Sequence, residues 1–303
     1  MKRTRPQASA VRSARATADP ARRSTTRRTA ARRPAARKTA QKTKPRRRTF
    51  TRPASVVWAV IPSRFASTRF PGKALAPIAG KPMIQHVVER TRLTRGLARV
   101  LVATDDERIR AVVEGFGGEA VMTGDHPTGT DRIHEAVMRE SRRGRAPDYV
   151  LNVQGDEPMI DPVDLERLVH GMVARPEAVM GTLMHPLKTE NEARDPNINK
   201  VVLDREGRAL YFSRSPIPYP RAEPLPGDRA TLGWRHVGIY LFRWDFLRTF
   251  AKLPMTPLSQ REQLEQLRAL ECGYPIHCFE ARSHGLGVDT PEQLRQVEAL
   301  LRG

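Results

Sequence analysis

The apolar residues of this chain gather in short continuous runs, separated by segments in which they recur every three or four positions. The first run, residues 56–62, has no polar alternation, which is typical of a strand buried on both faces of a parallel sheet. Three later runs predict further strands, at residues 99–104, 120–123 and 149–153. The helical spacings predict helices over residues 82–95, after Asp106 and from about Asp131. Strands that alternate with helices in this way form a parallel sheet with right-handed crossovers.

The pattern changes after residue 199. Two apolar runs, residues 200–204 and 209–212, flank a polar segment and predict an antiparallel hairpin. Residues 216–230 are rich in proline and predict a flexible loop that covers a site or mediates a dimer contact. The remaining elements are a strand at 237–242, helices at about 244–251 and 260–271, a strand near Ile276 and a last helix from Pro291. The expected fold class is α/β, with a mixed, mainly parallel central sheet, flanking helices and a small antiparallel insertion, in one domain over residues 54–303.

Charge divides the chain into two unequal parts. Residues 1–53 hold 19 Lys and Arg residues and one acid, Asp19, which gives this tail a net charge of +18. The remaining residues hold 34 basic and 32 acidic side chains and are nearly neutral. Phe50 is the only aromatic residue of the tail. Such a segment cannot bury enough apolar surface to offset chain entropy, so we expect residues 1–53 to be a disordered basic tail.

Three interpretations of the tail stay open. It contacts nucleic acid or another anionic surface non-specifically, or it is an organellar transit peptide. Alternatively, translation starts near Val56 or Val57 at a codon other than Met, because the next methionine after Met1 is Met83, inside the expected fold. The rest of the chain lacks basic faces interleaved with aromatic residues, which argues against nucleic-acid binding as the main function. With no apolar span of 18 residues and no hydrophobic signal region, a cytoplasmic protein without membrane insertion is expected.

Three cations follow the first predicted strand: Arg64, Arg69 and Lys73. Ligands of parallel sheets collect beyond the carboxyl ends of the strands. The arginines can form paired hydrogen bonds with phosphate oxygens, Lys73 supplies a compact charge, and Gly72 lets the backbone approach closely. The loop therefore suits a nucleoside triphosphate, with a solvated cationic turn as the alternative. It is not a Walker P-loop, because the upstream glycine is absent and Ala74 stands where Ser or Thr would hold magnesium.

Two adjacent carboxylates, Asp156 and Glu157, follow a glycine after the fourth predicted strand. Magnesium takes one or two carboxylates and completes its shell with phosphate oxygens and water. Asp156, at the same sheet edge as the cationic loop, is therefore a candidate magnesium ligand, and Asp289 supplies a second carboxylate. The alternatives are a helix cap for Asp156, although Asp161 already fills that place, and an ordinary helix start at Asp289.

A third polar segment, His126–Arg132, supplies hydroxyls, backbone amides and one arginine at the start of a helix. This chemistry suits a base or a phosphate, and a capped turn is the alternative. The only cysteines, Cys272 and Cys278, lack the second ligand pair of a zinc site even when His277 is counted with them. They are expected to be ordinary thiols.

Together these segments resemble the 3-deoxy-manno-octulosonate (Kdo) cytidylyltransferase family, which makes CMP-Kdo for lipopolysaccharide. The resemblance runs from Val57 to the end of the chain, and residues 1–53 have no counterpart in it. Ser63 and Phe65 depart from the family pattern, in which Ala and Tyr are expected. The matching segments are residues 61–73, 80–84, 103–105, 128–130, 152–158, 210–214, 235–240, 264–268 and 287–291.

The resemblance implies a Rossmann-like nucleotide-diphospho-sugar transferase fold that uses Mg²⁺ and CTP and is usually a homodimer. It implies the transfer of CMP from CTP to the 2-hydroxyl of Kdo, with release of pyrophosphate. Asp156 and Asp289 would hold the metal, and Lys73 would lie at the departing pyrophosphate. The residues implied to hold the triphosphate are Arg64, Ser67, Arg69 and Lys73.

The resemblance also assigns residues to the rest of the two substrates. The residues expected near cytidine or sugar are Thr128, Gly129, Thr130, Arg132 and Gln154. The expected sugar pocket consists of His236, Tyr240, Glu265 and Gln266, with Arg214 helping to hold the sugar. An 8-amino-Kdo or a sialic-acid-like acceptor stays open as an alternative to Kdo.

Overall fold

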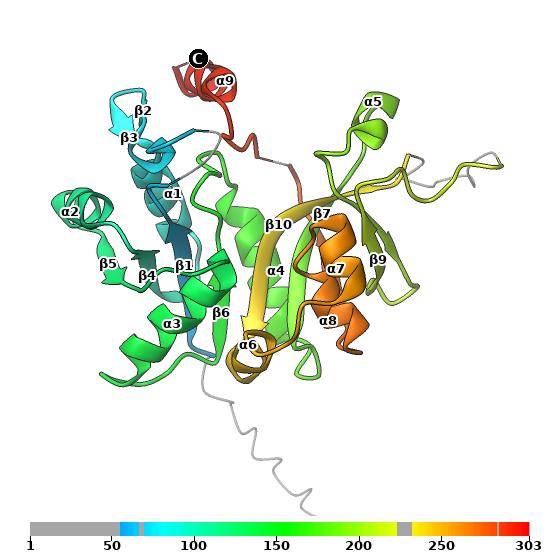
Figure 1. Ribbon diagram of the computed structural model, residues 1–303, viewed down its shortest axis with the longest axis horizontal. Coiled ribbons are helices and arrows are strands. Elements are labelled where there is room, and N and C mark those ends of the chain that lie inside the picture. Colours follow the sequence, from blue (N-terminus) through cyan, green and yellow to red (C-terminus); the bar gives the residue numbers. More distant parts are fainter. Residues whose placement is uncertain (1–54, 67–69, 223–231, 284, 303) are drawn as a thin grey trace, which may run out of the picture. The chain divides into compact units, whose positions relative to one another are not determined.

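The computed structural model describes residues 55–66, 70–222, 232–283 and 285–302. Over these residues a central sheet has the strand order β11-β7-β10-β6-β1-β4-β5, and a hairpin, β8-β9, joins it at β10 (Figure 1). Its strands are β1 Val57–Ser63, β4 Leu97–Thr104, β5 Glu119–Met122, β6 Tyr149–Asn152, β7 Met180–Pro186, β8 Lys200–Leu203, β9 Ala209–Ser213, β10 Trp234–Arg243 and β11 Ile276–Glu280.

Along the path from β11 to β5, most neighbouring strands are parallel. β1 is parallel to β4 and β6, β4 to β5, and β7 to β11. β10 breaks the pattern because it runs antiparallel between β6 and β7. The predicted mixed, mainly parallel sheet is confirmed, and so is the antiparallel hairpin of β8 and β9.

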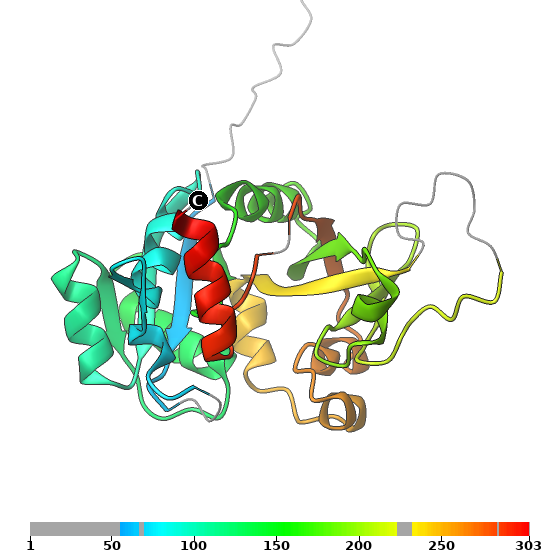
Figure 2. The same ribbon diagram turned by 90° about the horizontal axis from the view of Figure 1, so that it is seen from above.

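Helices cover both faces of the sheet (Figure 2). The buried side chains show that α1, α2 and α4 pack on one face, and α3, α6 and α8 on the other. The helices are α1 Met83–Arg92, α2 Glu107–Gly115, α3 Gly129–Ser141, α4 Pro162–Val173, α5 Glu190–Arg194, α6 Trp244–Phe250, α7 Pro257–Glu262, α8 Leu267–Glu271 and α9 Pro291–Arg302. A short ribbon of β2 (Pro77–Ile78) and β3 (Lys81–Pro82) lies beside α9. None of the helices in the described ranges is long and apolar enough to cross a membrane.

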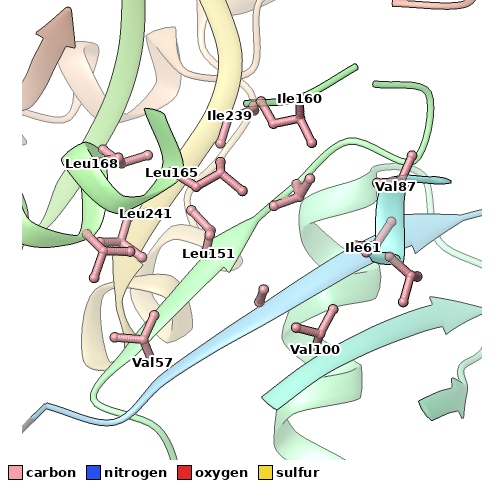
Figure 3. Close-up of a cluster of buried hydrophobic side chains, with 14 of the residues drawn as sticks. Val57, Ile61, Val87, Val100, Leu151, Ile160, Leu165, Leu168, Ile239 and Leu241 are labelled. Carbon is pink, nitrogen blue, oxygen red and sulfur yellow. The ribbon is translucent and has the colours of Figure 1, made fainter. Parts of the chain in front are cut away.

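The apolar first strand is buried on both faces, as its sequence predicts. Val57, Ala59 and Ile61 belong to the cluster under α1, α2 and α4, part of which Figure 3 shows. Trp58 and Val60 point the other way, into the cluster under α3. Each fully buried aliphatic side chain of this size stabilises the fold by about 1.5–3 kcal/mol. The strand is therefore a rigid base for the loop that follows it.

The predicted helix starts hold with one shift. Asp106 and Asp161 cap α2 and α4 by accepting backbone N–H groups two residues later. α3 begins at Gly129, two residues before the predicted start at Asp131, because Thr128 is the cap and accepts the N–H of Asp131. Since Asp161 caps α4, Asp156 is not needed for that purpose.

The prediction of one continuous helix over residues 260–271 is wrong. The structure has two short helices, α7 and α8, separated at Gln263, whose φ of +52° is left-handed. The guanidinium of Arg214 donates to the backbone carbonyls of Glu262 and Gln263. These bonds satisfy carbonyls that a continuous helix would pair internally. The break leaves residues 263–266 as a loop between the two helices, which matters for the site.

Strand β7 was not predicted at all. Its run is interrupted by Gly181 and by His185, so its apolar pattern is weak. The glycine has a tertiary reason, because a Cβ at this position would lie 2.6 Å from the sulfur of Met172 in α4. The short elements α5, β2 and β3 were not predicted either. Part of the predicted loop at 216–230 lies outside the described residues, so its role stays a prediction.

The two cysteines are free thiols. Cys278 lies in β11, where burial raises the pKa of its thiol to about 12. Such a thiol is not reactive at neutral pH.

Candidate active site

The loop after β1 is closed by a glycine turn. Gly72 has a φ of +71°, and a Cβ there would lie 3.1 Å from the ring of Phe65. Its N–H donates to the carbonyl of Phe65 over 2.9 Å. Only glycine adopts this backbone without strain, so the turn sets the position of Lys73, which begins a single 3₁₀ turn, Lys73–Leu75. Arg64 is exposed at the start of the loop.

Lys73 joins the two carboxylates that the sequence analysis selected as metal ligands. Its Nζ lies 2.5 Å from Oδ2 of Asp156 and 3.1 Å from Oδ1 of Asp289. It also donates to the carbonyl of Val288 over 3.2 Å. We call Lys73, Asp156 and Asp289 the charged cluster. The three side chains come from places far apart in the sequence, yet they meet around one positive charge.

Backbone contacts bring the two acidic loops together. The N–H of Val153 donates to the carbonyl of Val60, which carries the pairing of β1 and β6 one residue beyond the strand. Gly155 then passes so close to β1 that a Cβ would lie 2.9 Å from the carbonyl oxygen of Pro62. The N–H of Val288 donates to the carbonyl of Asp156 over 2.8 Å, which fixes the loop that carries Asp289.

The charged cluster lies in a cavity of about 250 Å³ at the carboxyl ends of β1 and β6. The predicted site residues on its wall are Arg64, Lys73, Thr128, Gly129, Arg132, Gln154, Asp156 and Asp289. Met83 and His126 also line it, although neither was predicted as a site residue. Ser67 and Arg69 were predicted here but lie outside the described residues.

At the start of α3, neighbouring side chains hold Arg132 in place. Arg132 is almost fully buried, and its guanidinium donates to Asp105 over 2.6 Å and to the Thr123 hydroxyl over 2.7 Å. These bonds give Arg132 a role in holding the cavity wall. The hydroxyl of Thr130 donates to Oε2 of Glu265 over 2.9 Å, a residue 135 positions later. The cavity is thereby tied to the loop between α7 and α8.

A second group of polar side chains lies beside this connection. His236 and Tyr240 project from β10 with their ring centroids 5.4 Å apart, and Glu265 and Gln266 come from the loop between α7 and α8. We call these four residues the buried polar cluster: His236 and Gln266 are buried, and Tyr240 and Glu265 are half-buried. Burial lowers the pKa of His236 to about 3 and, together with the charge of Glu265, raises the pKa of Tyr240. Burial also raises the pKa of Glu265, against the hydrogen bond from Thr130.

Two atoms of the buried polar cluster lack protein partners. Nδ1 of His236 and Nε2 of Gln266 are buried and make no hydrogen bond within the described residues. Buried polar atoms are nearly always paired in native proteins. Their isolation therefore indicates a place for a polar ligand. Gln154 connects this place to the cavity, because its side-chain amide donates to the carbonyl of Gly238 in β10 over 3.2 Å.

Arg214 belongs to a separate network. Its Nε and both terminal nitrogens donate to the carbonyls of Glu262, Pro196 and Gln263. Lys200, which is fully buried, donates to the carbonyl of Arg214 over 2.5 Å. These contacts bind the guanidinium of Arg214 to backbone carbonyls at the end of α7 and at Pro196. Its predicted contact with the sugar stays a prediction.

Glu157 stands beside Asp156 but was not predicted as a site residue. Its Oε2 is buried without a hydrogen-bond partner in the part of the chain that is described. A Cβ at Gly285 or Gly287 would lie about 3 Å from its carboxyl oxygens, so a larger residue at either position would crowd them. Burial, followed by the charge of Asp156, raises the pKa of Glu157 to about 8. The sequence signal was its place beside Asp156.

The charged cluster fits a divalent metal. An ammonium already sits within 3.1 Å of an oxygen from each carboxylate, so one cation can contact both. Two carboxylates with an open cavity beside them match the needs of magnesium, which completes its shell with phosphate and water oxygens. Asp156 and Asp289 would hold the ion.

Comparisons with known proteins match this geometry. A family model described as cytidylyltransferase matches residues 58–276. The chain therefore belongs to the cytidylyltransferase family, which confirms the class of enzyme that the sequence motifs indicated.

Individual relatives narrow the class. The chain is 54% identical to the 3-deoxy-manno-octulosonate cytidylyltransferase of Syntrophotalea carbinolica, over 82% of this chain and 99% of the relative. It is 49% identical to the 8-amino-3,8-dideoxy-manno-octulosonate cytidylyltransferase of Shewanella halifaxensis, over 81% of this chain and 98% of the relative. A solved structure of CMP:2-keto-3-deoxy-manno-octonic acid synthetase complexed with CTP matches with a TM-score of 0.75 and 46% identity, over 82% of this chain and 99% of that one.

Proposed function

We propose that this protein transfers CMP from CTP to the 2-hydroxyl of Kdo and releases pyrophosphate. The observation that carries the proposal is the meeting of Lys73 with Asp156 and Asp289 in the cavity at the sheet edge. The buried polar cluster lies beside this cavity, joined to it by the bond from Thr130 to Glu265. Relatives named as octulosonate cytidylyltransferases support the same activity.

The charged cluster suits the nucleotide. The attacking hydroxyl must approach the α-phosphorus past several negative charges, and the carboxylate of the sugar adds repulsion. Arg64 and Lys73 offset this repulsion, and Lys73 stabilises the charge that grows on the departing pyrophosphate. A magnesium ion held by Asp156 and Asp289 would neutralise phosphate charge. No covalent nucleophile of the protein is required.

The buried polar cluster suits the sugar acid. His236 and Tyr240 stay neutral at physiological pH because burial disfavours their charged forms. A polyhydroxylated sugar is recognised by hydrogen bonds to such neutral groups, and an analogue that lacks a bonded hydroxyl leaves a buried group unpaired. This arrangement selects the acceptor by its hydroxyl pattern.

Pyrophosphate release by the purified full-length protein tests the proposal. With magnesium and CTP, release is expected only when Kdo is added. Replacement of CTP by UTP, ATP or GTP is the control for the nucleotide and should abolish release. A folded protein that binds CTP but releases nothing with Kdo would contradict the acceptor.

The alternative acceptor is 8-amino-Kdo, because a relative of nearly the same identity carries that name. The two sugars should be assayed side by side at equal concentrations. A higher kcat/KM with the 8-amino sugar would replace Kdo in the proposal and leave the cytidylyl transfer intact.

Three properties stay predictions: the homodimer, the cytoplasmic location and the anion contacts of residues 1–53. The charge of the tail predicts DNA binding that weakens steeply with salt and disappears when residues 1–53 are removed. DNA binding retained by the shortened chain would contradict the assignment of that activity to the tail.

A further inference from the structure

A buried threonine outside the predicted site contacts the predicted sugar-binding histidine. Thr182 lies in β7 and is fully buried. Its Oγ1 lies 2.9 Å from Nε2 of His236, 3.1 Å from the carbonyl oxygen of Val237 and 2.8 Å from that of Ile239. One hydroxyl therefore lies within hydrogen-bond distance of three atoms of β10, a ring nitrogen and two carbonyl oxygens.

An irregularity in β10 creates this meeting. Val237 pairs with Leu183, but Thr182 pairs with Tyr240, so Gly238 and Ile239 are extra residues in β10. A bulge of this kind leaves carbonyls without ladder partners and redirects side chains, and bulges are common beside active sites. The hydroxyl of Thr182 faces the carbonyls on either side of Gly238 as their donor, and the amide of Gln154 donates to the carbonyl of Gly238 itself. His236 and Tyr240 flank the bulge.

The direction of the hydrogen bonds follows from counting protons. A threonine hydroxyl has one proton and can also accept. The two carbonyls can only accept, so the hydroxyl proton is donated to one of them or shared between them. If it pointed to His236 instead, two carbonyl oxygens near 3 Å would face only lone pairs. The bond between Thr182 and His236 must then be donated by Nε2–H of the ring.

This bond fixes the tautomer of the imidazole. A neutral imidazole with a proton on Nε2 has a lone pair on Nδ1. Phe212 packs edge-on against the ring at a centroid distance of 4.9 Å, and Tyr240 lies on another side. The ring is therefore held against two aromatic rings, and burial keeps it neutral by lowering the pKa of His236 to about 3.

Nδ1 is the atom left for a ligand. It is buried and makes no hydrogen bond within the described residues. As a lone-pair acceptor it can bind an O–H group but not a carboxylate or a carbonyl, which have no proton to donate. The missing partner is therefore a hydrogen-bond donor, such as a hydroxyl of a sugar.

We propose that Thr182 is a positioning residue that holds His236 as the Nε2–H tautomer, so that Nδ1 accepts a hydrogen bond from a hydroxyl of the acceptor sugar. The contact between Nδ1 and the sugar rests on the proposed function, whereas the tautomer of His236 does not. Nothing in the sequence of β7 indicates this role, because the contact depends on the bulge in the neighbouring strand.

The tautomer is measured first, by NMR of the full-length protein with ¹⁵N-labelled histidine and no substrate. The signals of His236 are assigned by their loss in His236→Gln. Wild type and Thr182→Ser, which keeps the hydroxyl, should both show a protonated Nε2 and an unprotonated Nδ1. Thr182→Val, which has nearly the same shape, should show a mixture of tautomers. A protonated Nδ1 in the wild type would overturn the proposal, as would an unchanged tautomer in Thr182→Val.

Kinetics test the hydroxyl contact. Thr182→Val should raise KM for the sugar about tenfold, as expected when a buried hydrogen bond is misdirected, while KM for CTP stays within about twofold. Thr182→Ser should restore the wild-type KM. An unchanged sugar KM in a Thr182→Val protein whose tautomer is altered would overturn the contact with the sugar. If no octulosonate reacts at all, the proposed function fails while the NMR result still decides the role of Thr182.

Discussion

The charged cluster and the buried polar cluster lie side by side but are built in opposite ways. Lys73, Asp156 and Asp289 stand in loops beyond strand ends, partly exposed to the cavity. His236 and Tyr240 stand on a strand, and burial keeps them neutral. Charges that face water can rearrange around an incoming ion, whereas buried neutral groups must be placed before the ligand arrives. The difference indicates that the charged cluster stabilises charge, whereas the buried polar cluster selects its ligand by hydrogen bonds.

Removal of one carboxylate of the charged cluster should have the largest effect. Asp156→Asn keeps the shape of the side chain but loses its charge, so turnover should fall about a hundredfold or more, as for other electrostatic stabilisers. The fold should remain, because the backbone contacts of Asp156 do not involve its carboxylate. Steady-state kinetics at saturating magnesium and thermal unfolding measure the two effects.

Asp161→Asn is the matched control for Asp156→Asn. Asp161 is a nearby carboxylate, but it caps α4, and asparagine caps equally well. Its turnover should stay near that of the wild type. Equal losses in both variants would mean that the charge of Asp156 has no special place in the reaction.

Glu157 gives the next largest effect, on the stability of the metal-free protein. Its pKa of about 8 lies above the ordinary value of 4.5. The folded protein thus holds a proton that the unfolded chain has lost, and the stability this provides is complete below about pH 4.5 and disappears as pH rises toward 8. Glu157→Gln cannot titrate. Between pH 5 and 8 the free energy of unfolding of this variant should rise by about 2 kcal/mol relative to that of the wild type. This is less than the full pKa shift implies, because the cavity nearby is open to water.

Urea unfolding across this pH range, in a metal chelator, measures the gain. The exposed Glu177 supplies the control, because Glu177→Gln should follow the wild-type curve at every pH. A pH-independent difference between Glu157→Gln and the wild type would show that the carboxyl of Glu157 is ionised in the folded protein.

The sequence predicted the charged cluster better than the buried polar cluster for a physical reason. Lys73, Asp156 and Asp289 each follow or precede a recognisable element, and the carboxyl ends of parallel strands meet at one edge. The sheet could therefore be predicted, and with it the neighbourhood of these side chains. Their convergence on one cation needed the structure, because it depends on the backbone bond between Val288 and Asp156.

The buried polar cluster came only from a family resemblance. His236 and Tyr240 look like ordinary members of an apolar strand, and the bulge that separates their environments leaves no mark in the residue pattern. Glu265 and Gln266 were placed in a predicted helix, because the break at Gln263 arises from contacts with Arg214 across the fold. Local propensity cannot show such a break, since tertiary hydrogen bonds override it.

Metal binding by a Lys73 variant tests the charged cluster separately from the buried polar cluster. In the nucleotide-free protein its ammonium occupies the space between Asp156 and Asp289, so a divalent ion must displace it. Lys73→Met removes that competing charge. The affinity of the nucleotide-free protein for Mn²⁺ should rise about tenfold, which corresponds to one unit charge at about 3 Å in a watery site. Electron paramagnetic resonance of free Mn²⁺ measures this affinity.

The same variant should bind CTP more weakly, because a phosphate contact is lost. Lys81→Met is the control, since Lys81 pairs with Glu89 on the surface away from the cavity. It should change neither affinity. Weaker Mn²⁺ binding by Lys73→Met would mean that Lys73 supports the metal instead of competing with it.

The hydroxyl of Thr130 should give the smallest effect, and it tests whether the two clusters are independent. Its bond to Glu265 joins the start of α3, beside the cavity, to the buried polar cluster. Thr130→Val removes a hydrogen bond with a net value of about 1 kcal/mol, so KM for the sugar should rise a few fold, roughly three to five. Thr130→Ser keeps the hydroxyl and should match the wild type. KM for CTP should stay unchanged, because the Thr130 hydroxyl points toward Glu265. Equal rises in both constants would mean that the clusters respond as one unit, and that the division between charged and neutral recognition is not functional.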